Sequence, residues 1–186
     1  MIKQRFFNEV FYYGVYKPAG KLKGKNNCID LGACTGEFSL WVNQQFNHIY
    51  SIEGHKDLFP HLKENVSDFS NIHPFHMALG DWNGSGHMEG GTDGGARLSK
   101  DQNPTEDDIP VMTLAKFMEK EGISYVDCLK VDIENGEYEV FHSEDFPSVA
   151  NKIGMIIGEH VPTQVGGLLK GLGFKEIQGE IYYYKR

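Results

Sequence analysis

Asn27-Cys28-Ile29-Asp30-Leu31-Gly32-Ala33-Cys34-Thr35-Gly36 joins a short apolar run to a segment with the spacing of an amphipathic helix. The apolar run ends at Gly32, and apolar residues then recur at Phe38, Leu40, Trp41, Val42 and Phe46. A buried strand, a glycine-containing turn and a helix form the repeating unit of parallel α/β sheets. This stretch therefore predicts the class of the fold.

The same alternation continues along the chain. Further strands are expected at residues 48–53, 72–79, 126–132 and 153–161. Helical spacing lies between and after them, at residues 58–66, 113–120, 137–142 and 168–172. Two apolar runs around Gly179 and Glu180 predict a closing antiparallel hairpin. We therefore expect an α/β, doubly wound, mostly parallel sheet.

The composition fits one domain over residues 1–186. Hydrophobic residues make up 40 % of the chain, which is enough for one core. The formal net charge of −8 works against a nucleic-acid partner, because such binding depends on clustered Lys and Arg. No apolar run approaches the roughly 18 residues of a membrane span, and residues 1–10 lack the apolar core of a secretory signal. We expect a cytoplasmic protein without a membrane partner.

Two segments fall outside the alternation. Residues 1–24 are rich in Phe and Tyr and are expected to form a helical segment that packs on the sheet or over a ligand. Residues 80–110 contain many glycines and few apolar residues, which predicts an inserted hairpin or flap. Two of the three cysteines lie inside apolar runs, where we expect core residues instead of disulfides or metal ligands, and the absence of a CxxC pair disfavours a structural zinc site.

Ligands of open α/β sheets bind at the carboxyl ends of the strands. Gly32 and Gly36 let the backbone approach a ligand there, and the helix after Gly36 directs its amides at an anionic group. The loop lacks the G-x-G-x-x-G pattern of a pyrophosphate site, and Asp30 suits an ammonium group better than a phosphate. Glu53, 21 residues after Gly32, stands where a carboxylate can accept ribose hydroxyls.

Three carboxylates, Asp132, Glu134 and Glu137, follow the expected fourth strand within six residues. Acidic residues favour the start of a helix, so a structural role for Glu134 and Glu137 is an alternative. Asp132 and His160 end adjacent expected strands, and either can take a proton from an attacking hydroxyl group. His160 has the suitable intrinsic pKa.

Several of these motifs together resemble the FkbM-type S-adenosylmethionine-dependent methyltransferases. The likeness covers roughly residues 25–162 and is most specific at Lys130-Val131-Asp132-Ile133-Glu134-Asn135-Gly136-Glu137. It implies a mostly parallel seven-stranded sheet in a three-layer α/β/α arrangement. It also implies S-adenosylmethionine as cofactor and O-methyl transfer to a small hydroxylated acceptor such as a sugar, a polyketide or a small metabolite. Cys34, in place of the usual Asn, and Asn135 depart from the family pattern.

The resemblance also implies roles for individual residues. Asp30, Gly32, Ala33 and Gly36 would hold the methionine part of the cofactor. Glu53 would hold the ribose, and Leu79 with Asp81 would lie on the adenine side. Asp132 would lie nearest the methyl group, so the candidate catalytic residues are Asp132, His160 and Glu134. No metal ligand is implied.

Three other functions remain open. A metal-dependent enzyme would use Asp132, Glu134 and Glu137 with Glu159 or His160 as ligands. A nicotinamide dehydrogenase is disfavoured by the missing phosphate loop. A cofactor-binding partner subunit without catalytic activity would share the binding residues.

Overall fold

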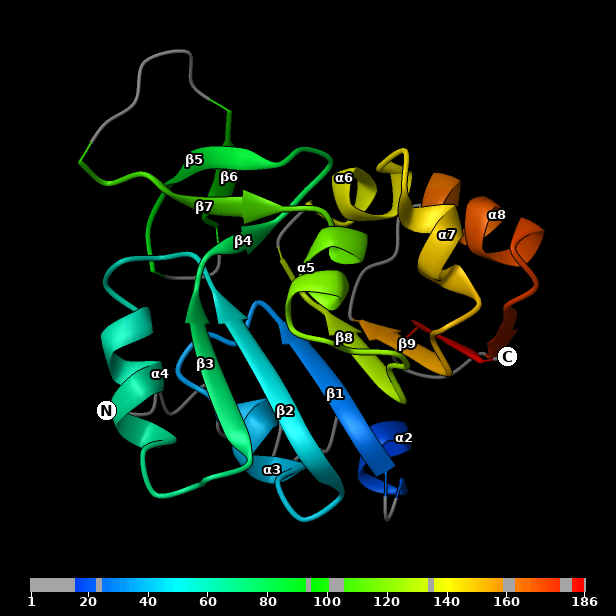
Figure 1. Cartoon of the computed structure of the whole chain (residues 1–186), viewed down its shortest axis with the longest axis horizontal. Coiled ribbons are helices and arrows are strands. Elements are labelled where there is room, and N and C mark those ends of the chain that lie inside the picture. The colour runs from blue at the N-terminus through cyan, green and yellow to red at the C-terminus, as the bar shows by residue number, and fades with distance from the viewer. Residues whose placement is uncertain are drawn as a thin grey trace.

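The central sheet determines where every candidate residue lies. The computed structural model describes residues 16–22, 25–92, 95–100, 106–133, 136–158, 163–177 and 182–185. The sheet has seven strands in the order β10-β11-β9-β8-β1-β2-β3 (Figure 1). Their bounds are β1 Lys25–Leu31, β2 Phe46–Glu53, β3 Ile72–His76, β8 Cys128–Val131, β9 Met155–Gly158, β10 Lys175–Ile177 and β11 Tyr182–Lys185. Five strands, from β9 to β3, pair in parallel, and β11 pairs antiparallel with both β9 and β10. The expected α/β fold with a closing hairpin is confirmed.

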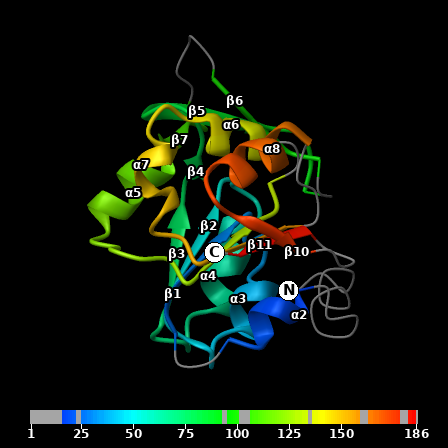
Figure 2. The ribbon, with the colours of Figure 1, turned by 90° about the vertical axis from the view of Figure 1, so that its right-hand side faces the viewer.

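Helices cover both faces of this sheet, as the view along its edge shows (Figure 2). On one face lie α2 Lys17–Gly20, α3 Glu37–Trp41 and α4 Phe59–Asn65. On the other lie α5 Leu114–Lys120, α6 Glu137–His142, α7 Phe146–Ala150 and α8 Thr163–Gly171. Neighbouring residues of one strand serve the two cores: Ile29 packs with Phe117 of α5, whereas Cys28 packs with Phe38 of α3. Burial of both faces explains why the strands read as continuous apolar runs.

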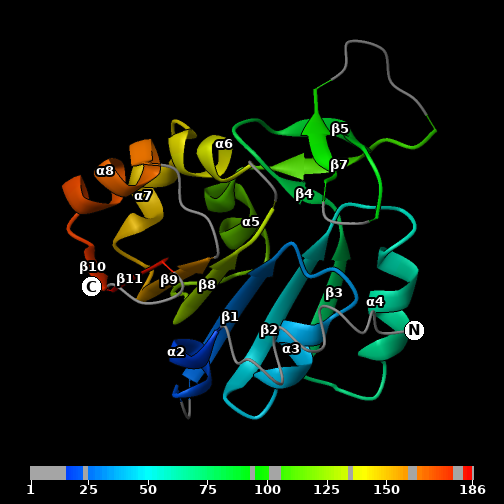
Figure 3. The same ribbon diagram turned by 180° about the vertical axis from the view of Figure 1, so that it is seen from behind.

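The expected third strand, residues 72–79, is divided between two sheets. The chain leaves the central sheet at Met77, and β4 Ala78–Leu79 pairs in parallel with β7 Ile109–Met112. The antiparallel strands β5 Gly84–Glu89 and β6 Arg97–Ser99 complete a second sheet in the order β4-β7-β5-β6. This sheet lies above the carboxyl ends of β2 and β3 (Figure 3).

Other element boundaries differ from the expected ones in ways that packing explains. The first helix ends at Trp41, and Phe46 instead begins β2, where it pairs with Lys25. Helix α7, which has a proline in its first turn, was not expected. Thr113 caps α5 by accepting a hydrogen bond from the backbone N–H of Lys116, as predicted. Cys28 and Cys128 are free and fully buried, as expected of core residues.

The end of β1 meets the end of β8 at Gly32. Gly32 has φ +78°, and a Cβ atom there would lie 1.9 Å from the carbonyl oxygen of Asp132. The backbone N–H of Asp132 donates to the carbonyl of Leu31 at 3.1 Å, so the two chain segments are already in contact. Only glycine fits at this crossing.

We expect Gly32→Ala to destabilise the protein more than Gly122→Ala. Gly122 also has positive φ (+67°), but a Cβ there meets no atom within 4 Å. Its replacement should cost about 1–2 kcal/mol from backbone conformation alone. The steric clash at Gly32 should add about 2 kcal/mol or more. Urea unfolding of both variants measures the difference, and equal losses of stability would contradict the close contact.

Candidate functional site

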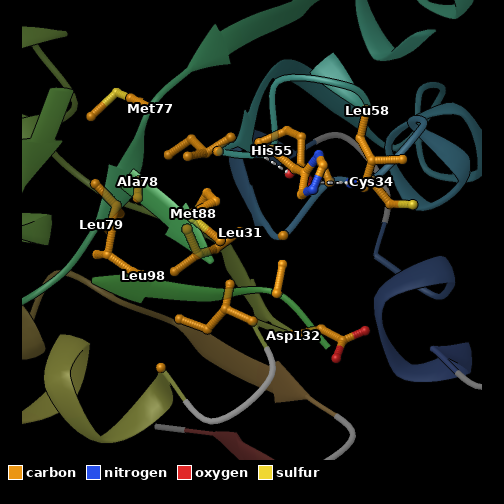
Figure 4. A pocket seen from close by; sticks show the side chains of 18 of the residues that line it. Leu31, Cys34, His55, Leu58, Met77, Ala78, Leu79, Met88, Leu98 and Asp132 are labelled. Atoms are coloured by element: carbon orange, nitrogen blue, oxygen red, sulfur yellow. Dashed lines mark hydrogen bonds between the residues drawn. The ribbon is translucent and has the colours of Figure 1, made fainter. Parts of the chain in front are cut away.

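A cavity of about 270 Å³ lies at the carboxyl ends of β1, β2 and β8, under the second sheet. Asp132 lies on the side away from Met77 and Leu79, and Met88 and Leu98 of the hairpin cover the space between (Figure 4). The residues that line the cavity from the strand ends are Leu31, Gly32, Ala33, Cys34, Ile52, Glu53, Gly54, His55, Lys130, Asp132 and Ile133.

Glu53 is fixed by the backbone around it. Its carboxylate accepts hydrogen bonds from the N–H of Cys34 at 2.8 Å and from the N–H of His55 at 2.6 Å. Burial raises the pKa of the Glu53 carboxyl, although the same two amide bonds act to lower it. Glu53 therefore joins the loop after β1 to the loop after β2 at the cavity wall.

The loop after β1 presents backbone and a neutral side chain to the cavity. The N–H groups of Gly32 and Ala33 both donate to the carbonyl of Ile52, at 3.1 and 2.9 Å. Cys34 adopts φ +52°. Burial, and then the carboxylates of Glu37 and Glu53, raise the pKa of the Cys34 thiol to about 12, so it stays protonated at neutral pH.

Asp30 does not lie where the sequence suggested. It is 0 % exposed and does not line the cavity. Its carboxylate pairs with the ammonium group of Lys130 at 3.1 Å and accepts the hydroxyl of Ser39 at 2.6 Å. Lys130 on the neighbouring strand β8 thus neutralises the Asp30 carboxylate, and the ammonium group of a ligand has no direct access to this carboxylate.

Two further expected residues also lie apart from the cavity lining. Gly36 packs against Leu62 and Val66 of the α4 side. Asp81 is exposed and lines a separate depression, because the chain has already turned into the second sheet at that point. Ala33, Glu53 and Leu79 do line the cavity, together with Gly32 and Asp132.

Lys130 is the main residue that sequence reasoning missed. It is 3 % exposed, and its ammonium group donates to the carbonyl of Gly32 at 2.6 Å while pairing with Asp30. It also lies 3.9 Å from Asp132. Burial acts to lower the pKa of Lys130, but the carboxylates of Asp30 and Asp132 raise it overall. Its position between Leu129 and Val131 in an apolar run was the available signal.

Asp132 is held from a second direction by the N-terminal part of the chain. The hydroxyl of Tyr16 donates to Oδ2 of Asp132 at 2.8 Å, and the Asp132 side chain is 32 % exposed. Glu137 is buried and accepts the N–H of Ile133, away from the cavity lining. Glu134, Glu159 and His160 lie outside the described residues, as does the segment 1–15.

The hairpin of β5 and β6 supplies an apolar cover. Trp82, Met88 and Leu98 pack on a small cluster of Ala78, Ile109 and Val111 and also line the cavity. These isolated apolar residues in a glycine-rich segment gave no periodic signal, which is why the sequence predicted a flap without predicting which of its residues face the site.

Among the described residues, no group of three or more His, Cys, Asp or Glu side chains is arranged to hold a metal ion. The longest of the described helices, α8, has nine residues, whereas a span needs about 20, so no described helix could cross a bilayer.

The fold is similar to that of several methyltransferases of known structure. A precorrin-6y C5,15-methyltransferase from Geobacter metallireducens aligns with a TM-score of 0.57 and 11 % identity, over 100 % of this chain and 91 % of that chain. Fibrillarin from Aeropyrum pernix, crystallised with S-adenosylmethionine, has a TM-score of 0.56 and 14 % identity, over 96 % and 76 %. An rRNA methylase from Streptococcus thermophilus has a TM-score of 0.53 and 8 % identity, over 100 % and 98 %.

The sequence identifies the family. The model of the methyltransferase FkbM domain matches residues 30–175, which is more than half of the chain. The protein therefore belongs to the FkbM methyltransferase family and is an S-adenosylmethionine-dependent methyltransferase. No curated protein sequence matches it.

The raised pKa of Glu53 predicts a pH-dependent stability difference. When the pKa of a carboxyl is higher in the folded state than in the unfolded state, the folded state binds its proton more tightly. The resulting contribution to stability is complete below the unfolded-state pKa of about 4.3 and is lost as the pH rises through the folded-state pKa. Glu53→Gln removes the titration, so the free energy of unfolding of the variant should improve relative to wild type as pH rises from about 4 to 7.

Urea unfolding across this pH range measures the difference, with Glu119→Gln as control. Lys116 lowers the pKa of the exposed Glu119, so the Glu119→Gln difference should have the opposite sign of pH dependence. A Glu53→Gln difference that stays constant with pH would show that burial does not perturb this carboxyl.

Proposed function

We propose that this methyltransferase transfers a methyl group to a hydroxyl oxygen of a small hydroxylated molecule, such as a sugar, a polyketide or a comparable metabolite, with Asp132 as the base. The observation that carries the proposal is the Asp132 carboxylate, which lies at the cavity wall, partly exposed and held by Tyr16. His160 stays a second candidate base, and Glu134 a third catalytic candidate, on sequence grounds.

The cavity residues fit S-adenosylmethionine. The backbone of Gly32 to Cys34 leaves no room for a Cβ at its first position and offers a close approach to the methionine part. The Glu53 carboxylate suits ribose hydroxyls, because each carboxylate oxygen accepts more than one hydrogen bond. Apolar side chains, including Leu58, Met77 and Leu79, suit the flat adenine ring. When bound, the cofactor supplies a methyl group activated by a positively charged sulfur.

The protein's own part in the reaction is alignment and proton removal. Gly32, Glu53, Met88 and Leu98 would hold the donor in place, which favours a near-attack geometry. Asp132 would accept the proton of the acceptor hydroxyl while the hydroxyl oxygen takes up the methyl group that the bound cofactor would supply. A carboxylate can keep its hydrogen bond to Tyr16 while it takes up this proton.

A small acceptor is favoured over a nucleic acid for two reasons. The chain carries 26 acidic against 18 basic residues, which opposes binding to phosphates. Met88 of β5 and Leu98 of β6 also cover the cavity, and these two strands would act as a lid over small ligands.

Cofactor binding should appear as thermal stabilisation. At a hundred times its dissociation constant, S-adenosylmethionine should add about 2.7 kcal/mol, which for this size means a rise in Tm of roughly 5–10 °C. S-adenosylhomocysteine should give a similar rise and NAD none. Thermal unfolding with each ligand measures this, and stabilisation by NAD alone would contradict the proposed site.

Asp132→Asn should lower kcat about 100-fold while the affinity for S-adenosylmethionine, measured by calorimetry, changes only a few-fold. His160→Ala should behave in the same way if His160 shares the proton transfer. Turnover is followed as S-adenosylhomocysteine released over a panel of sugars, polyketides, hydroxy acids and RNA. Asp68→Asn, an exposed position, is the control. If Asp132→Asn loses cofactor binding together with activity, Asp132 is a cofactor-binding residue instead. Turnover on RNA alone would overturn the small-acceptor proposal.

A further inference from the structure

A chain of polar side chains runs from the middle of the sheet to the cavity wall. The hydroxyls of Ser51 and Ser39 lie 2.7 Å apart, and Ser39 donates to Asp30 at 2.6 Å. Asp30 pairs with Lys130 at 3.1 Å, and Lys130 lies 3.9 Å from Asp132. Every member before Asp132 is buried, so Asp132 is the point where this chain reaches solvent.

The ammonium group of Lys130 is held firmly within this chain. It donates to the carbonyl of Gly32 at 2.6 Å and contacts the carbonyl of Leu31 at 3.4 Å, in addition to the ion pair with Asp30. An ammonium has three donors, so these contacts use its whole hydrogen-bonding capacity. The distance of 3.9 Å to Asp132 is therefore an electrostatic contact and not a hydrogen bond.

Charge in this group is not balanced. One ammonium lies between two carboxylates, Asp30 and Asp132, and only Asp30 is fully enclosed with it. The remaining negative charge belongs to the partly exposed Asp132, on the side of the cavity. In a partly buried site the field of a fixed cation 3.9 Å away is screened much less than at the surface.

We propose that Lys130 is a positioning residue for the reaction, because its fixed ammonium holds the Asp132 carboxylate in its orientation at the cavity wall. The proposal rests on the proposed role of Asp132 as the base. Lys130 contacts two separate parts of the site, the loop after β1 through Gly32 and the candidate base through Asp132. The hydroxyl of Tyr16 assists by donating to Oδ2 of Asp132, the oxygen that also lies nearest Lys130.

Several polar and charged groups lie around Asp132. Tyr16 faces it from the residue before α2, and Lys130, with Asp30 behind, faces it from the sheet. Glu139 of α6 lines the same cavity but is exposed. Among these described groups, Lys130 supplies the positive charge and Tyr16 the hydrogen bond, so removal of either should loosen the hold on the Asp132 carboxylate.

The test compares two variants that both lack the charge of Asp30. Lys130→Met alone would leave the Asp30 carboxylate buried without its partner and could prevent folding. Asp30→Asn retains Lys130, and Asp30→Asn/Lys130→Met removes it without leaving a buried charge. Circular dichroism and urea unfolding first establish that both full-length variants fold, and calorimetry measures their affinity for S-adenosylmethionine.

We expect the double variant to bind S-adenosylmethionine within about threefold of Asp30→Asn, because the loop after β1 is also held by the carbonyl of Ile52. Its kcat should be lower by about tenfold or more, as expected when a reacting group is misplaced. Tyr16→Phe, which keeps the ring packed on Phe38 but loses the hydrogen bond to Asp132, should also lower kcat while its affinity for S-adenosylmethionine stays within about threefold of wild type.

Equal kcat values for Asp30→Asn and the double variant would overturn the proposal, since Lys130 would then only neutralise Asp30. If the double variant does not fold, an unchanged kcat in Tyr16→Phe overturns the positioning of the Asp132 carboxylate. A different result would contradict the proposed function itself: wild-type turnover in Asp132→Asn would show that Asp132 is not the base, independently of the result for the Lys130 variants.

Discussion

The ion pair between Asp30 and Lys130 is the interaction on which the site depends. It joins adjacent strands at the centre of the sheet, where both partners are almost completely enclosed. Burying two charges is costly, and two hydrogen bonds offset part of this cost: Ser39 donates to Asp30, and the carbonyl of Gly32 accepts from Lys130. The same ammonium therefore fixes the end of β1 and the end of β8 together, and these two ends form the floor of the cavity.

The two sheets supply different parts of the cavity wall. The central sheet supplies the polar groups, with Glu53 held by amides of two loops and Asp132 held by Tyr16. The second sheet supplies the apolar cover through Met88 and Leu98. Met77, where the chain passes from one sheet to the other, donates its N–H to the carbonyl of Glu53, so the cover is connected directly to the polar half.

Much of this fold could be predicted from the sequence, because parallel strands buried on both faces leave short apolar runs that are bounded by glycines. Glu53 and Asp132 were also found, since both end such a run. The role of Asp30 could not be predicted, because its partner Lys130 comes from a strand far along the chain and pairing between strands has no local signal. For the same reason the split of residues 72–79 between two sheets, which depends on pairing with β7, was not visible.

The two strands that flank β1 come from distant parts of the sequence, and this affects how the protein folds during synthesis. β2 follows β1 closely, but β8 arrives much later: Lys130 and Leu31, which are in contact, stand 99 positions apart. Closing so long a loop carries an entropic cost and slows folding. During synthesis on the ribosome, Asp30 has no partner until Lys130 has emerged. Until then the core around β1 is incomplete, and the cavity at the ends of β1 and β8 cannot form.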